Sequence, residues 1–143
     1  MLIHGTCVAG AGIGILLRGP SGSGKSDLAL RLINDGFRLV ADDQVLLQRE
    51  GDTVTASPPA VLAGLIEVYG VGIMPMPHES RAIVALVVDL VAPDAVERMP
   101  QPDYCRLLER EIRRIDLAPF QVAAPAKLRL LAAAIAQRQT WPQ

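Results

Sequence analysis

The sequence predicts a single α/β domain, residues 1–143, in which helices flank a central mixed sheet. Half of the 143 residues are apolar, which is enough for a sizeable core. Short and almost wholly apolar runs at 13–18 and 82–90 are typical of strands buried on both faces. A glycine-rich loop at 19–26 joins the first of these runs to a segment with helical periodicity. Strands that alternate with helical segments in this way favour the α/β class.

The N-terminal third supplies three predicted strands and one helix. Residues 2–8 and 13–18 are two apolar runs separated by glycines. A helix is predicted from Lys25, because leucine and isoleucine side chains recur at helical spacing and Gly36 marks its end. A third strand follows at 37–41 and finishes at two consecutive aspartates.

The middle of the chain is predicted to be mostly β-structure. Residues 45–48 and 53–55 flank a polar turn that contains glycine, which indicates a hairpin. A further strand is predicted at 65–68, and the glycine- and proline-rich residues 69–77 are predicted to be loop. The run at 82–90 is predicted to be a buried strand.

The C-terminal third begins with an irregular segment. Residues 92–103 contain three prolines, so we expect a mobile or partner-facing stretch. The pattern then predicts a last strand at 112–117 and a C-terminal helix at 126–137.

Composition excludes several classes of partner. Fourteen Lys and Arg balance fifteen Asp and Glu, so no overall field recruits nucleic acid or an anionic membrane. Aromatic residues make up 3% of the chain, too few for a base-stacking platform. The apolar run at 82–88 is far shorter than a membrane span, and the first residues lack the features of a signal peptide. With Cys7 and Cys105 as ordinary free thiols, we expect a cytoplasmic protein.

The loop at 19–26 carries the strongest chemical signal. It fits the pattern G-x-x-x-x-G-K-[ST] and lies between a predicted strand and a predicted helix, as a phosphate-binding loop requires. Its glycines let backbone N–H groups point at phosphate oxygens, and the helix N-terminus faces the same anion. Lys25 is expected to reach the β- and γ-phosphates, and the Ser26 hydroxyl is expected to ligate Mg²⁺. The residues predicted to bind ATP are Gly19, Pro20, Ser21, Gly22, Ser23, Gly24, Lys25 and Ser26.

Phosphoryl transfer also needs a second metal ligand and a group that orients or deprotonates the acceptor. Asp42 and Asp43 end a predicted strand, and strand carboxyl ends line the ligand crevice of α/β sheets. Neighbouring carboxylates on a strand point in different directions and can hold different roles, although a solvated turn pair is the alternative. Glu67 is a second acidic candidate. The alternative is that it is an exposed strand residue without a role in the site. Taken alone, His4 is better explained as a half-buried strand histidine than as a catalytic residue.

Four segments taken together resemble the catalytic domain of bacterial HPr kinase/phosphorylase. They are His4-Gly5, the loop at 19–26, the strand and aspartate pair at 37–43, and the Ile-Glu-Val-Tyr-Gly-Val-Gly-Ile block at 66–73. The order and spacing match from residue 3 to about residue 74, and the match is weaker afterwards. The last two blocks are more specific to this family than the phosphate-binding loop.

The resemblance implies roles for individual residues. Lys25 and its loop bind ATP, and Ser26 and Glu67 ligate Mg²⁺. Asp43 accepts the proton of the HPr serine in the kinase direction. In the reverse direction it assists phosphate to attack phosphoserine, which gives pyrophosphate. His4 lies beside this site, and Arg106, in a Tyr-x-Arg-Leu segment, is similar to a family arginine that contributes to catalysis.

A surface arginine in a charged, helix-like stretch is the alternative for Arg106. The hexameric habit of the family further implies a homo-oligomer.

Three departures from the family pattern affect the expected activity. The chain begins almost at the first strand of the catalytic domain, as in the truncated alphaproteobacterial forms. Tyr69 stands where the family signature usually has arginine, and Ala124-Pro125-Ala126-Lys127 only loosely matches an element linked to phosphorolysis. Loss of a cation near developing negative charge weakens catalysis, so we expect kinase activity to exceed phosphorylase activity.

Two other functions compete with an HPr kinase. One is a nucleotide-gated binding module, which would tolerate asparagine at Asp43, whereas a kinase needs a proton acceptor there. The other is a small-molecule kinase of the P-loop class, for which Arg110, Arg113 and Arg114 could supply a lid that clasps the phosphates.

Overall fold

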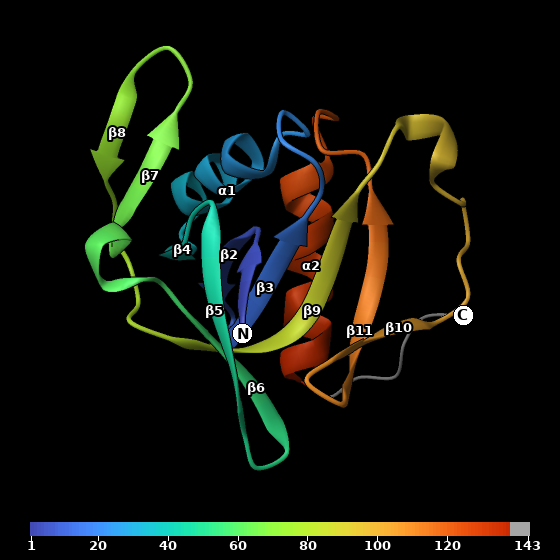
Figure 1. Cartoon of the computed structure of the whole chain (residues 1–143). Coiled ribbons are helices and arrows are strands. Elements are labelled where there is room, and N and C mark those ends of the chain that lie inside the picture. The colour runs from blue at the N-terminus through green and yellow to red at the C-terminus, as the bar shows by residue number, and fades with distance from the viewer. Residues whose placement is uncertain (138–143) are drawn as a thin grey trace.

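The computed structural model describes residues 1–137 (Figure 1). Within that range two α-helices accompany the strands, α1 (Lys25–Asn34) and α2 (Ala124–Ala136). Short 3-10 turns lie at Ala60–Leu62 and Pro93–Ala95. The strands are β1 (Leu2–His4), β2 (Thr6–Gly10), β3 (Ile13–Arg18), β4 (Arg38–Ala41), β5 (Gln44–Glu50), β6 (Thr53–Ser57), β7 (Leu65–Val68), β8 (Gly72–Pro75), β9 (Ala82–Leu90), β10 (Asp103–Leu107) and β11 (Arg110–Leu117).

Strand β9 organises a mixed, curled sheet. It pairs in parallel with β3 and with β11, and its first residues pair antiparallel with β6. The path through the sheet runs β1-β5-β6-β9-β3-β2-β4, with β11 and then β10 branching from β9. Because β3, β9 and β11 run in the same direction, their carboxyl ends meet at one end of the molecule, the top in Figure 1. The loops that follow these three strands therefore lie side by side.

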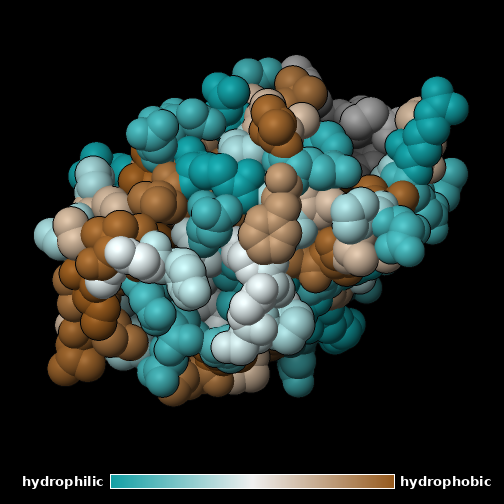
Figure 2. Space-filling view, turned by 90° about the horizontal axis from the view of Figure 1, so that it is seen from above, coloured by the Kyte–Doolittle hydropathy of each residue, from teal (hydrophilic) through white to brown (hydrophobic). Residues whose placement is uncertain are grey.

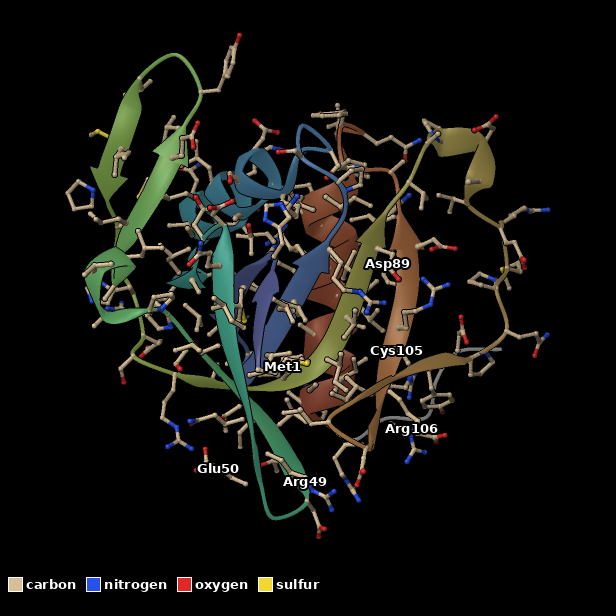
Figure 3. The ribbon with its side chains drawn as sticks, in the orientation of Figure 1. Met1, Arg49, Glu50, Asp89, Cys105 and Arg106 are labelled. Atoms are coloured by element: carbon tan, nitrogen blue, oxygen red, sulfur yellow. The ribbon has the colours of Figure 1, made fainter. Side chains whose placement is uncertain are left out.

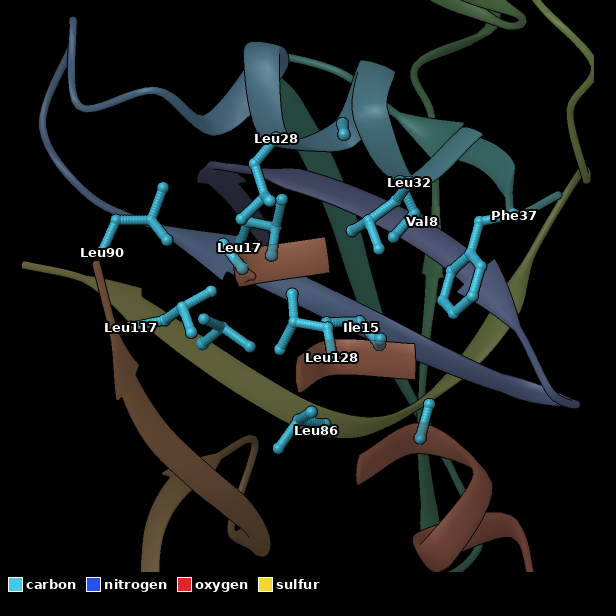
Figure 4. Close-up of a cluster of buried hydrophobic side chains, with 14 of the residues drawn as sticks. Val8, Ile15, Leu17, Leu28, Leu32, Phe37, Leu86, Leu90, Leu117 and Leu128 are labelled. Carbon is cyan, nitrogen blue, oxygen red and sulfur yellow. The ribbon is translucent and has the colours of Figure 1, made fainter. Parts of the chain in front are cut away.

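Both helices pack on the same face of this sheet. Leu28 and Leu32 of α1 and Leu128 of α2 are fully buried against Ile15 and Leu17 of β3 (Figure 4). Burial of such side chains contributes about 1.5–3 kcal/mol each. This cluster fixes the position of α1, whose first two residues, Lys25 and Ser26, complete the phosphate-binding loop.

The opposite face of the same strands is buried by the curl of the sheet. Leu16 points away from the helices and joins Val45 and Val54 of the β5–β6 hairpin in a second cluster. Cys7 lies in this cluster, and desolvation raises the pKa of its thiol to about 12. Two-sided burial explains why 13–18 and 82–90 are apolar runs without alternation.

The predicted fold class is confirmed, and three local predictions need correction. Residues 72–75, predicted as loop, form β8 and pair with β7 in a separate two-stranded sheet. Residues 103–107 form β10, a strand that the sequence reading missed and in which Arg106 lies, so this stretch is not helical. The strand predicted at 2–8 is two strands, because the chain leaves β5 at Gly5 and continues beside β3. Pairing with distant partners determines each of these elements, and local periodicity does not report it.

Among residues 1–137 no helix combines the length and the apolarity needed to cross a membrane.

The packing of α2 predicts different costs for two leucines on one helix. Leu128 is fully buried, whereas the side chain of Leu130 is 76% exposed. Leu128→Ala should lower the free energy of unfolding by about 2–5 kcal/mol, because it leaves a cavity in the core. The matched control Leu130→Ala should change it by less than about 0.5 kcal/mol. Urea unfolding followed by circular dichroism measures both, and equal losses would contradict the assigned packing.

Candidate active site

The loop at 19–26 turns tightly at its glycines and leads directly into the N-terminus of α1. Gly22 and Gly24 adopt positive φ angles of 81° and 99°, a conformation that costs other residues strain. Gly24 caps α1, which begins at Lys25. The first backbone N–H groups of a helix have no partner within it, so this end suits an anion.

Lys25 lies within the curve of its own loop. Its side chain is largely buried, and Nζ donates hydrogen bonds to the carbonyl oxygens of Gly19 at 2.7 Å and Pro20 at 3.0 Å. Desolvation lowers the pKa of Lys25, and the carboxylates of Asp43 and Asp42 oppose that effect. The loop thus places one cation where phosphate oxygens would lie.

The buried carboxylate of Asp42 joins three segments of the chain. Oδ1 accepts hydrogen bonds from Ser26 Oγ at 2.6 Å and from Thr6 Oγ1 at 3.0 Å. Oδ2 accepts the backbone N–H of Glu67 at 3.0 Å. Hydrogen bonds to a charged group contribute about 1.5–3 kcal/mol each. Asp42 therefore holds Ser26 of α1, Thr6 of β2 and Glu67 of β7 in fixed relative positions.

Asp43 points away from its neighbour because the backbone reverses there. Its φ angle is +69°, in the left-handed region that aspartate tolerates better than most residues. The carbonyl of Asp43 accepts the N–H of Gly5, which brings the β1–β2 junction alongside. His4 Nδ1 consequently lies 3.4 Å from Asp43 Oδ1, and both side chains are more than half exposed. The carboxylate of Asp43 is thus accessible from solvent, whereas that of Asp42 is buried.

Glu67 faces the same region. Ile66 is buried in the core and Glu67 is exposed, as the alternation of a strand requires. Ser26 and Glu67 therefore stand on either side of the Asp42 carboxylate.

The donor set fits a hard cation. It consists of hydroxyl and carboxylate oxygens, which Mg²⁺ prefers. Among the described residues no three His, Cys, Asp or Glu side chains are gathered as a ready-made metal cage. Mg²⁺ typically takes one or two protein carboxylates together with substrate phosphates and water, so two protein ligands suffice.

One cavity of about 520 Å³ unites these residues. It opens on the top face, which Figure 2 shows from above. Its lining is His4, Thr6, Ser21, Gly22, Gly24, Lys25, Ser26, Asp27, Leu30, Asp42, Asp43, Glu67, Val68, Tyr69 and Phe120. The structure therefore brings together the predicted residues His4, Lys25, Ser26, Asp43 and Glu67, although the chain separates the first from the last by more than sixty positions.

Arg106 is not brought to this cavity. It lies on β10, and Figure 3 shows it at the bottom of the molecule, whereas the phosphate-binding loop is at the top. Its Nη2 atom lies 3.4 Å from the carbonyl oxygen of Glu109, at the turn that joins β10 to β11.

The three arginines considered as a lid, Arg110, Arg113 and Arg114, lie on β11. Arg114 binds the carboxylates of Asp89, Asp103 and Asp116 at 2.7–3.0 Å. Desolvation is the largest single influence on the pKa of Asp89 and acts to raise it, but the hydrogen bonds and positive charges of Arg18 and Arg114 together lower that pKa. Arg110 lies against Asp52, and Arg113 lies over the ring of Tyr104. These contacts brace the sheet instead of forming a flexible lid.

Among the cavity residues that the sequence did not single out are Thr6 and Phe120, and Asp42 had no role of its own. Thr6 is one polar residue in an apolar strand, and nothing local marks it. Phe120 follows β11, and the rule that ligands bind beyond the carboxyl ends of strands could have drawn attention to it. Asp42 was paired with Asp43 without a separate role, because only the tertiary contacts distinguish the two.

Comparisons with known proteins agree on one family. Residues 1–118 match the family described as the HPr serine kinase C-terminal domain. HPr kinase/phosphorylase from Lactobacillus acidophilus is 38% identical over 138 residues, covering 88% of this chain and 41% of that protein. The Geobacillus kaustophilus protein of the same name is 40% identical over 135 residues, covering 87% of this chain and 42% of its own length. This chain thus spans about two fifths of these relatives.

A solved structure, the Hpr(Ser) kinase/phosphatase from Coxiella burnetii, superposes with a TM-score of 0.85. It is 25% identical, and the match covers 96% of this chain and 97% of that chain. The fold is therefore shared along nearly the whole chain.

The contacts of the two aspartates predict unequal effects of one substitution. Asp42→Asn replaces a carboxylate oxygen that accepts hydrogen bonds with an amide that donates them, so it should lower the free energy of unfolding by about 1–2 kcal/mol. Asp43→Asn should stay within about 0.5 kcal/mol, because the side chain is exposed and asparagine tolerates the same backbone conformation. Urea unfolding of the two variants makes the comparison. A larger loss for Asp43→Asn would contradict the assigned contacts.

Proposed function

The chain belongs to the HPr serine kinase C-terminal domain family, and we propose on that basis that it transfers the γ-phosphoryl group of ATP to a serine of an HPr-type phosphocarrier protein. One observation carries the proposal. Beside a phosphate-binding loop, two adjacent aspartates are turned to different tasks, one buried against Ser26 and one exposed beside His4. A protein kinase needs this separation, since nucleotide and protein acceptor approach from different sides.

The ATP side of the reaction rests on α1 and its loop. The backbone N–H groups of residues 19–26 and the Lys25 ammonium hold the β- and γ-phosphates. Ser26 and Glu67 hold Mg²⁺, which, when bound, neutralises charge on the phosphate oxygens. Asp42 orients Ser26 through the 2.6 Å hydrogen bond and Glu67 through its backbone N–H.

The acceptor side rests on Asp43. Its carboxylate takes the proton of the seryl hydroxyl as the seryl oxygen bonds to the γ-phosphorus, and the bond from that phosphorus to the bridging oxygen of ADP breaks. His4, 3.4 Å away, orients this carboxylate. The exposure of both side chains supports the assignment, because a folded protein substrate must reach them.

The reverse reaction is proposed as a weaker activity. Inorganic phosphate attacks phosphoserine-HPr, the serine oxygen leaves with a proton from Asp43, and pyrophosphate forms. Tyr69, fully exposed at the rim of the cavity, offers no charge to the additional phosphate. This is the reason to expect kinase activity to dominate.

Partner contacts are proposed at the β7–β8 hairpin beside the cavity. Tyr69, Val71 and Ile73 are at least two-thirds exposed there, and hydrophobic surface gathers at the left of Figure 2, where this hairpin projects. Exposed apolar clusters of this kind mark protein contacts. We assign this surface to HPr and to other copies of the chain in a cytoplasmic homo-oligomer. Arg106 lies at the end of the molecule opposite the cavity. A catalytic role for Arg106 therefore requires that it reach the cavity of a neighbouring copy.

Two alternative functions would need chemical groups different from those of an HPr kinase. A nucleotide-gated binding module would need Lys25 and Ser26 but no proton acceptor at position 43. A small-molecule kinase would need an arginine lid that closes over the phosphates. The arginines considered for such a lid lie on β11, where Arg114 is bound to Asp89 and Arg110 lies against Asp52.

The proposal predicts separate losses for the two sides of the site. Asp43→Asn should lower kcat for phosphorylation of purified HPr by about 10²- to 10⁴-fold with ATP affinity retained, since a general base is removed. Lys25→Ala should abolish ATP binding and transfer together. The carboxylate control is Asp52→Asn, in the distant β5–β6 turn, which should match the parent.

Transfer is measured with radiolabelled ATP and Mg²⁺, and the modified residue is mapped by mass spectrometry. An Asp43→Asn variant with parental kcat would contradict the assigned base and favour the binding-module alternative. Phosphorylation of a residue other than serine would contradict the proposed acceptor.

The exposed position of Tyr69 predicts the effect of restoring a cation. Tyr69→Arg should raise the rate of pyrophosphate formation from phosphoserine-HPr and phosphate by about tenfold or more, because it supplies charge where a second phosphate binds. Tyr69→Phe is the control and should leave this rate unchanged. If Tyr69→Arg leaves the phosphorolysis rate at the parental level, the explanation for the weaker reverse activity is wrong.

A further inference from the structure

A second cavity, of about 430 Å³, lies beside the phosphate-binding loop at the carboxyl ends of the three parallel strands. Its walls come from the loop after β3, the residues that end and follow β9, and the residues that follow β11. They are Ser23, Leu90, Val91, Ala92, Pro93, Ala118, Pro119, Phe120 and Gln121. In α/β sheets ligands bind beyond the carboxyl ends of strands, and pockets of about 300–1,000 Å³ hold small molecules. The lining is predominantly apolar, unlike that of the neighbouring phosphate cavity.

Phe120 connects this cavity to the phosphate site. It lines both cavities. Its ring packs on the phosphate-binding loop so closely that a Cβ atom at Gly24 would lie 2.8 Å from it. Despite that contact the side chain is 70% exposed, so a large aromatic face is available to a ligand. A ligand seated on this ring would be adjacent to Lys25 and the N-terminus of α1.

Ser23 is the second residue between the two sites. It belongs to the phosphate-binding loop and also lines the apolar cavity. Its Oγ atom is buried and has no hydrogen-bond partner within residues 1–137. Buried hydroxyls are usually partnered, so this atom suits a polar group of a ligand that spans the two cavities.

Arg31 fixes the loop that carries Phe120. From the outer face of α1 its guanidinium donates hydrogen bonds to the carbonyl oxygens of Pro119 and Gln121, the residues on either side of Phe120. Asp27, one turn earlier, holds the same guanidinium at 2.9 Å. The aromatic ring is therefore held in place before any ligand binds, which reduces the entropy lost on binding.

We propose that this apolar cavity holds the purine base of the nucleotide, with one face of the base on Phe120 and the ribose beside Ser23. The inference rests on the proposed function, because it takes ATP as the ligand of the neighbouring loop. A purine has two apolar faces and stacks on aromatic rings, and a triphosphate chain leads from it to a cationic loop. Phe120 lines both cavities, and Ser23 belongs to the phosphate-binding loop while lining the apolar one. These two residues place the two environments next to each other, as one nucleotide requires. A competing occupant is an apolar side chain of a partner protein.

The test compares ATP with inorganic tripolyphosphate, which lacks the nucleoside. Dissociation constants of both are measured by calorimetry with Mg²⁺ and without HPr. Phe120→Ala should weaken ATP binding by about tenfold, the usual effect of losing an aromatic stacking partner, and leave tripolyphosphate binding within about twofold. Phe120→Tyr should restore ATP binding, because it keeps the ring. The matched control is Val122→Ala, two residues further along and 99% exposed, which should change neither.

Two outcomes would overturn the inference. Equal losses for ATP and tripolyphosphate would mean that Phe120 only supports the phosphate-binding loop. Parental ATP affinity in Phe120→Ala would leave the cavity to a partner side chain. A second variant guards against a local rearrangement: Arg31→Gln frees the Phe120 loop and should weaken ATP binding but not tripolyphosphate binding.

The proposed function fails independently of this inference. If the parent chain binds ATP more tightly than tripolyphosphate in a Phe120-dependent way and transfers no phosphate to HPr, the kinase proposal is wrong and the base site stands. If transfer to HPr proceeds at the parental rate and affinity in Phe120→Ala, the base site is wrong and the kinase proposal stands.

Discussion

The carboxylate of Asp42 is the contact on which the site depends. It accepts hydrogen bonds from a residue of β2, a residue of α1 and the backbone of β7, so three segments far apart in the chain meet at two oxygen atoms. Thr6 is fully buried, so its hydroxyl would be unsatisfied without this carboxylate, and an unsatisfied buried donor costs about 1–3 kcal/mol. These hydrogen bonds hold together helix α1, strand β7 and strand β2.

The turn at Asp43 gives two neighbouring carboxylates different surroundings. Along a regular strand the pair would alternate across the sheet, with one carboxylate lost to the far face. Strand β4 ends at Ala41, and the left-handed conformation at Asp43 turns the side chain of Asp43 toward solvent and His4. Non-glycine residues in this conformation cluster at functional sites, where surrounding contacts sustain the strain. Here the contact is the hydrogen bond from Gly5 to the Asp43 carbonyl.

The parallel arrangement of β3, β9 and β11 explains why the loops with chemical groups lie at one end. The phosphate-binding loop follows β3, the 91–93 segment follows β9, and the Phe120 loop follows β11. The antiparallel strands β5 and β6 instead close the second core cluster and leave that end open. Ion pairs also tie the three parallel strands together beneath the site: Asp89 of β9 binds Arg18 of β3 and Arg114 of β11, and Arg114 also binds Asp116 of its own strand.

The sequence alone determined the fold class, the glycine-rich loop that leads from a strand into a helix, and the strand that leads to the aspartate pair. Each depends on local information: two-sided burial makes a continuous apolar run, and tight turns with a helix N-terminus demand glycine, lysine and serine at fixed spacing. The tertiary structure decided the rest. It separated Asp42 from Asp43, formed β8 and β10, moved Arg106 away from the cavity and set Phe120 against Gly24. These features arise from contacts between residues distant in the chain, and the pattern along a strand does not encode which distant partner satisfies a carboxylate or covers a loop.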